Sequence, residues 1–222
     1  MVFLISVLLG LAMGSGTVFS LHYGAGNHVA LRRSIFSSFV LIGIVTLILN
    51  VAVFIWLDPI LRLLQFPQDI YGMMRSYLWI IFCGIVFTFI YNFYASLLRA
   101  VGDSVTPLWF LAVSVVLNIA LDLFFILQLD WGIQGAAAAT VFAQGVAALG
   151  IIIYTYRRRP ELRWHHEDMC FDRTCLKEIA SFSTLTCVQQ SVMNLGILMI
   201  QGLVNSFGTA VMAAFAAAVK ID

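Results

Sequence analysis

Six stretches of this chain are apolar over about 20 residues or more, the length that a helix needs to cross the hydrocarbon core of a bilayer. They cover residues 1–21, 34–57, 71–95, 107–128, 133–156 and 179–207, and a seventh apolar segment begins at residue 209. Segments of this length cross a bilayer as helices, because each helix satisfies its own backbone hydrogen bonds. The pattern predicts an all-α integral membrane protein, a polytopic helix bundle.

The charged residues fall between these stretches. Only 10% of the residues are charged, whereas about a quarter are charged in a soluble domain. One set of alternate loops carries nine basic residues, and the other set carries Arg62 and Arg75. The nine are Arg32, Arg33, Arg99, Arg157, Arg158, Arg159, Arg163, Arg173 and Lys177. This asymmetry predicts that the basic loops face the cytoplasm. The net charge of +1 says nothing about nucleic acid, and no nucleic-acid partner is expected.

Glycine and proline mark two local features of the predicted spans. Gly10, Gly14 and Gly16 lie along the first span, where small residues permit close packing against a neighbouring helix. The second span is expected to end at Asp58-Pro59, because proline disfavours a helical conformation at the residue before it. Residues 58–70 would then form a short amphipathic piece at the membrane surface.

The four cysteines follow no disulfide framework. Cys170 and Cys175, with His165 and His166 nearby, suggest a metal site as one interpretation. Their spacing matches no standard zinc pattern, which favours an ordinary polar loop.

Asp122 is the only acidic residue well inside any predicted span. A carboxylate in a membrane is costly, so it indicates a functional site. Asn118 lies one helical turn before it and points the same way. At about 1.5 Å per residue, Asp122 lies about 9 Å, Thr140 about 12 Å and Tyr77 about 9 Å below the same membrane surface. Four oxygen-bearing side chains are therefore expected to share one layer.

Such oxygens suit a proton relay or a small hard cation, with Na⁺ bound by Asp122, Asn118 and Thr140. The alternative is that Asn118, Thr140 and Tyr77 only join helices through hydrogen bonds. The amides Gln189, Gln190, Asn194 and Gln201 in the sixth span allow the same two interpretations. No pattern of a serine hydrolase, zinc protease or ATP-binding loop occurs, so no catalytic residue or cofactor is expected.

Three motifs resemble the MATE family of multidrug and toxic-compound extrusion transporters: LLRAVGDSVTP, LNIALDLFFI and WGIQGAAAATVFAQ. SLHYGAGN and VNSFGTAVMAAFAAAVKI look like further landmarks of that family. The resemblance implies a twelve-helix transporter with two six-helix lobes. Residues 1–156 would be the N-lobe without its first helix, 157–178 a cytoplasmic inter-lobe loop, and 179–222 the start of the C-lobe. The chain is therefore expected to be part of a longer protein.

The resemblance also implies a coupling-ion site. In many prokaryotic members, an Asp and an Asn on the fifth helix, a Thr on the sixth and a Tyr on the fourth match Asp122, Asn118, Thr140 and Tyr77. A further Asp on the first helix would lie outside this chain. Some members carry a carboxylate on the seventh helix, where this chain has the amides Gln189 and Gln190.

The resemblance implies that the protein is a secondary active multidrug efflux transporter and not an enzyme. It would exchange H⁺ or Na⁺ for cationic or amphipathic drugs by alternating access, as a monomer in the plasma membrane of a prokaryote. One alternative is a flippase for lipid-linked oligosaccharides, which would need cationic residues in its cleft. No Lys or Arg lies well inside any predicted span. An intramembrane enzyme is a second alternative and would need a nucleophile or metal ligands at one depth.

Overall fold

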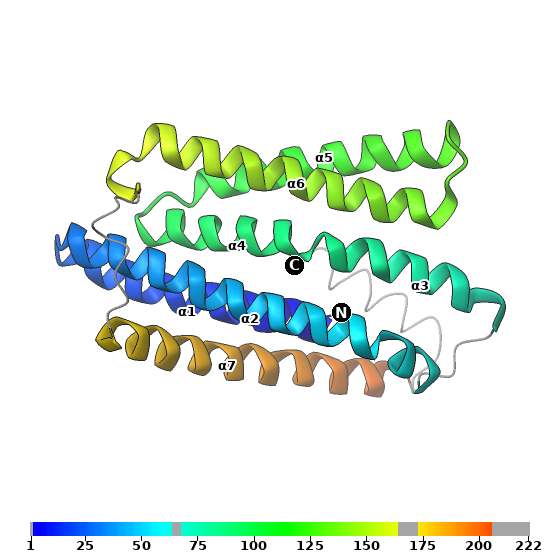
Figure 1. Ribbon diagram of the computed structural model, residues 1–222, viewed down its shortest axis with the longest axis horizontal. Coiled ribbons are helices and arrows are strands. Elements are labelled where there is room, and N and C mark those ends of the chain that lie inside the picture. The colour runs from blue at the N-terminus through cyan, green and yellow to red at the C-terminus, as the bar shows by residue number, and fades with distance from the viewer. Residues whose placement is uncertain (1, 64–67, 164–172, 206–222) are drawn as a thin grey trace.

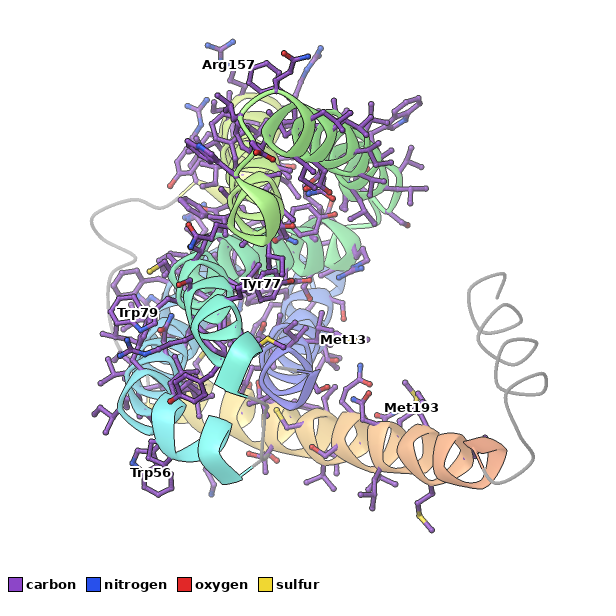
Figure 2. All side chains as sticks on the ribbon, turned by 90° about the vertical axis from the view of Figure 1, so that its right-hand side faces the viewer. Met13, Trp56, Tyr77, Trp79, Arg157 and Met193 are labelled. Carbon is purple, nitrogen blue, oxygen red and sulfur yellow. The ribbon has the colours of Figure 1, made fainter. Side chains whose placement is uncertain are left out.

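Every element of the structure, a computed structural model that describes residues 2–63, 68–163 and 173–205, is a helix. Most of the helices run roughly along the long axis of the molecule (Figure 1), whereas α7 crosses that axis obliquely (Figure 2). They are α1 (Val2–Gly24), α2 (His28–Leu63), α3 (Gln68–Cys83), α4 (Ile85–Ala100), α5 (Val105–Leu127), α6 (Gly132–Arg158), the short η1 (Pro160–Leu162) and α7 (Arg173–Asn205). The predicted all-α bundle is confirmed.

Five stretches of the described chain are long and apolar enough to cross a membrane. They are Ile5–Gly24, His28–Leu57, Tyr71–Ala100, Val105–Leu127 and Gly132–Arg158, and they agree with the first five predicted spans. The predicted sixth span, residues 179–207, lies within α7 as far as Asn205, and α7 is not among these five stretches. The predicted segment from residue 209 lies outside the described residues.

Two helices, α6 and α1, each pack against three other long helices. α6 packs against α3, α4 and α5, whereas α1 packs against α2, α4 and α7. In Figure 1, α5 and α6 form one edge of the bundle and α7 the opposite edge. Between them, Phe93 of α4 is fully buried and makes edge-on contacts with Phe19 of α1 and Phe39 of α2. The core therefore joins α1, α2 and α4.

The connections that carry the basic residues lie at one end of the bundle. The α1–α2 turn, the α4–α5 turn and the end of α6 share the left-hand end of Figure 1. There, Asp103 accepts a hydrogen bond from the Thr106 backbone N–H at 3.1 Å and lies 3.7 Å from the Arg159 guanidinium. The carboxylate thus caps α5 and also links it to the end of α6.

The predicted end of the second span agrees with the apolar stretch His28–Leu57, but the helix itself does not end at Asp58-Pro59, because α2 continues through Pro59 to Leu63. Proline removes one helical hydrogen bond but does not forbid a helix whose neighbours hold it in place. Leu57, in the turn before Pro59, is buried in a cluster with Leu8, Phe82 and Ile85. That burial fixes the direction of the last turns. Residues 64–67 of the predicted surface piece lie outside the described residues.

The predicted third span is confirmed as Tyr71–Ala100, and within it a one-residue turn at Gly84 separates α3 from α4. A Cβ at position 84 would lie 2.5 Å from Val141 Cγ2, so a side chain there would displace Val141 of α6. Just before the break, the Phe82 carbonyl accepts a hydrogen bond from Asn50 Nδ2 of α2 at 2.9 Å. Asn50 therefore supplies a donor where the helix is interrupted.

Replacing Asn50 with Leu is expected to lower the free energy of unfolding by about 1–2 kcal/mol, because a buried carbonyl loses its donor. Unfolding of the purified protein in mixed micelles, followed by circular dichroism, measures the change. Gln128→Leu is the matched control, since this amide is exposed at the end of α5. Equal stability of the Asn50→Leu variant and the wild type would contradict the assigned role.

Candidate functional site

Asp122 lies on the side of α5 that faces α6. The helix exposes Val116, Ile119 and Leu123, whereas Asn118 and Asp122 are half-buried. The Asp122 Oδ1 atom is buried and has no hydrogen-bond partner among the described residues. An unpaired buried carboxylate oxygen is costly unless a proton or a cation neutralises it. This oxygen is the feature of the structure that most directly indicates a ligand.

Asn118 and Thr140 connect α5 to α6. Asn118 Nδ2 donates a hydrogen bond to Thr140 Oγ1 at 3.3 Å, and Thr140 Oγ1 donates to the Ala136 carbonyl at 3.0 Å. The helices approach closely because α6 begins with small residues. A Cβ on Gly135 would lie 3.0 Å from Phe125 Cβ. The structure thus brings together two predicted site residues, with Asp122 one helical turn from Asn118.

Tyr77 comes from a different part of the bundle. It lies on α3, which packs against α6 but not against α5. Figure 2 shows Tyr77 and Trp79 projecting from opposite sides of this helix, with Trp79 on the outside. Among the described residues, no hydrogen bond joins Tyr77 to Asp122, Asn118 or Thr140. Its place in the site remains a prediction.

The polar layer continues along α6 beyond the predicted residues. Gln144 lies one turn after Thr140, and its Oε1 accepts a hydrogen bond from Thr88 Oγ1 of α4 at 3.0 Å. Asn92 Nδ2 donates in turn to the Thr88 carbonyl at 2.8 Å. The four-residue spacing of Thr140 and Gln144, and of Thr88 and Asn92, was the signal available in the sequence. We call Asn118, Asp122, Thr140, Gln144, Thr88 and Asn92 the polar row.

The MatE family model matches residues 1–124 of this sequence. The chain belongs to the MatE family. It is 32% identical over 225 residues to the probable multidrug resistance protein YpnP of Bacillus subtilis (strain 168), an alignment that covers 98% of this chain and 48% of YpnP. The predicted membership of the MATE transporters is confirmed.

Solved structures agree with the MatE fold. A crystal structure of MATE in complex with MaL6 superimposes with a TM-score of 0.90 at 22% identity, covering 99% of this chain and 49% of that one. The Vibrio cholerae MATE transporter VcmN in its bent form gives a TM-score of 0.85 at 25% identity, covering 99% and 50%. This MatE chain therefore spans about half the length of the relatives it matches. The division into two lobes stays a prediction.

The predicted alternative of a metal site in this MatE chain falls mostly on residues that the structure does not describe. His165, His166 and Cys170 lie outside the described residues. Cys175 is buried, and its Sγ lies 3.1 Å from the Ser34 hydroxyl. Within the described ranges, no three His, Cys, Asp or Glu side chains gather as metal ligands. The polar row is thus the candidate site that the geometry favours.

Proposed function

We propose that this MatE chain belongs to a secondary active multidrug exporter, in which H⁺ or Na⁺ entering the polar row drives the exit of cationic or amphipathic drugs. The observation that carries the proposal is the buried Asp122 Oδ1 without a partner. The proposed location is the plasma membrane of a prokaryote. The proposed activity is transport by a monomer, without catalysis and without a nucleic-acid partner.

The residues of the polar row fit a small cation chemically. Asp122 supplies a carboxylate, while Asn118 and Thr140 supply an amide oxygen and a hydroxyl oxygen at the same helix pair. These are the ligands that a hard cation uses, and the carboxylate also suits a proton. Because Asn118 donates to Thr140 and Thr140 to the α6 backbone, a cation that reorients either side chain changes the contact of α5 with α6.

In the proposed mechanism, the cation and the drug bind alternately, because each favours a different packing of α5 and α6. A cation at Asp122 compensates its negative charge and favours the packing of α5 and α6 that binds the drug weakly. A drug favours the other packing and weakens cation binding by the same factor. The names of two relatives, the probable multidrug resistance proteins YpnP and YoeA, support this direction of transport. We assign no individual drug.

The test is dye accumulation in vesicles that contain the protein. If one H⁺ or one Na⁺ is exchanged for each ethidium ion, a tenfold cation gradient should support about a tenfold ethidium gradient. Each tenfold concentration ratio corresponds to about 1.4 kcal/mol. Ionophores specific for each ion identify the cation, and protein-free vesicles are the control. Accumulation that persists after both gradients are collapsed, or that requires ATP, would overturn the proposal.

A further inference from the structure

A polar hollow lies where α1, α2 and the beginning of α7 meet, away from the polar row. It has a volume of about 240 Å³, and its lining includes His22, Asn27, Val29, Arg33 and Glu178. His22 ends α1, Arg33 lies in the second turn of α2, and Glu178 lies in the second turn of α7. Three separate helices therefore contribute to this hollow, which we call the α1–α2–α7 hollow.

The α1–α2–α7 hollow carries both signs of charge. Its cation is Arg33, whose Nε atom is buried without a hydrogen-bond partner among the described residues. Its anion is Glu178, whose side chain is 50% exposed and whose Oε2 lies 4.0 Å from His22 Nε2. A buried guanidinium donor without a partner is costly, so it suits a phosphate or carboxylate oxygen from a ligand. The half-exposed Glu178 carboxylate suits a ligand with a positive group.

The surroundings of the hollow are those of a membrane surface. It lies at the end of the bundle that holds the basic loops. Two apolar side chains near the hollow are exposed: Leu21 of α1 by 57% and Val29 of α2 by 47%. A ligand whose head enters the hollow would thus place an apolar part against exposed apolar side chains. Polar hollows between membrane helices at this level are suited to lipid headgroups.

We propose that the α1–α2–α7 hollow binds the headgroup of phosphatidylethanolamine. The Arg33 guanidinium donates to the phosphate oxygens, and the primary ammonium donates to the Glu178 carboxylate and to His22 Nε2. Phosphatidylcholine presents the same two charges, but its quaternary ammonium has no N–H to donate. Phosphatidylglycerol presents no cation to Glu178. The hollow therefore selects a zwitterionic lipid with N–H donors.

Native mass spectrometry of the purified 222-residue chain tests the selectivity. The chain is mixed with equal amounts of phosphatidylethanolamine, phosphatidylcholine and phosphatidylglycerol that have identical acyl chains. Phosphatidylethanolamine is expected to be retained about tenfold better than either competitor, because charged hydrogen bonds are lost with each of them. In the series with one, two and three N-methyl groups, retention by the wild type should fall with each N–H removed. This series needs no variant to fold.

Two variants test separately how the anionic and the cationic side chain of the hollow contribute to lipid binding. Glu178→Gln should lower the retention of phosphatidylethanolamine to that of phosphatidylcholine, while Arg33→Gln should lower the retention of both lipids. Arg157→Gln is the control, since Arg157 is exposed on α6, which contributes no residue to the lining of this hollow. Equal retention of phosphatidylethanolamine and phosphatidylcholine by the wild type would overturn the proposal. Preference for phosphatidylglycerol, or retention unaffected by Glu178→Gln, would overturn it as well.

Discussion

Replacing Asp122 with Asn is expected to abolish the stabilisation of the protein by its coupling cation. A cation that binds only the native state adds about 2.7 kcal/mol to the free energy of unfolding at a concentration 100 times its Kd. Asn cannot release a proton or supply a negative charge to Na⁺, so the gain should vanish. Unfolding midpoints of the purified protein are measured across a Na⁺ titration at constant ionic strength and, separately, across a pH series.

The Asp122→Asn variant should still fold, because it replaces a buried, unpartnered carboxylate oxygen with a neutral group of similar shape. Asp130→Asn is the matched control, since Asp130 is exposed in the turn between α5 and α6. The control should respond to cations as the wild type does. If Asp122→Asn keeps the full cation response, or if the wild type responds to neither Na⁺ nor pH, Asp122 is not the coupling carboxylate.

Replacing Gly14 with Leu is expected to destabilise the protein by about 3 kcal/mol, the upper part of the usual range for overpacking. A Cβ at Gly14 would lie 2.6 Å from the Ser183 backbone N and 2.8 Å from the Phe182 carbonyl carbon. One turn earlier, a Cβ at Gly10 would lie 2.8 Å from Cys187 Cα. These are backbone contacts that no rotamer change can relieve, so α1 and α7 would have to separate.

Separation of α1 from α7 would also break a row of hydrogen bonds. Ser183 Oγ donates to the Leu11 carbonyl at 3.2 Å, and Asn194 Nδ2 donates to Ser6 Oγ at 2.6 Å. Cross-helix bonds of this kind contribute modestly each, and here they depend on the close approach that the glycines permit. The Gly14→Leu variant should therefore unfold at a lower denaturant concentration, as followed by circular dichroism in mixed micelles.

The control for Gly14→Leu is Gly196→Leu. Gly196 is also a helical glycine of the α1–α7 pair, but a Cβ there would meet no atom within 4 Å. Leu has a higher helix propensity than Gly, so this control should be neutral or slightly stabilising. Equal stability of the two variants would show that α1 and α7 are not packed as closely as the structure has them.

Several properties of this protein could be predicted from the sequence because they depend on local composition. Apolar stretches of bilayer length must become helices, and the clustering of Lys and Arg assigns the loops to two ends. The cost of a carboxylate in an apolar stretch singled out Asp122, and the four-residue spacing placed Asn118 on the same face. The glycines of the first span predicted a close helix contact.

The remaining features depended on contacts between distant segments. Burial of Leu57 accompanies a helix that continues through Pro59, and Gly84 lies against Val141 of α6. The rise per residue gave the depth of each polar side chain, but the direction around each helix axis depends on which helices pack together. Only the tertiary structure therefore joined Thr140 to Asn118 and added Gln144 and Thr88. It also gave Gly10 and Gly14 their partner in α7. Local sequence cannot contain that information, because each of these contacts joins residues from separate helices whose pairing is decided by the packing of the whole bundle.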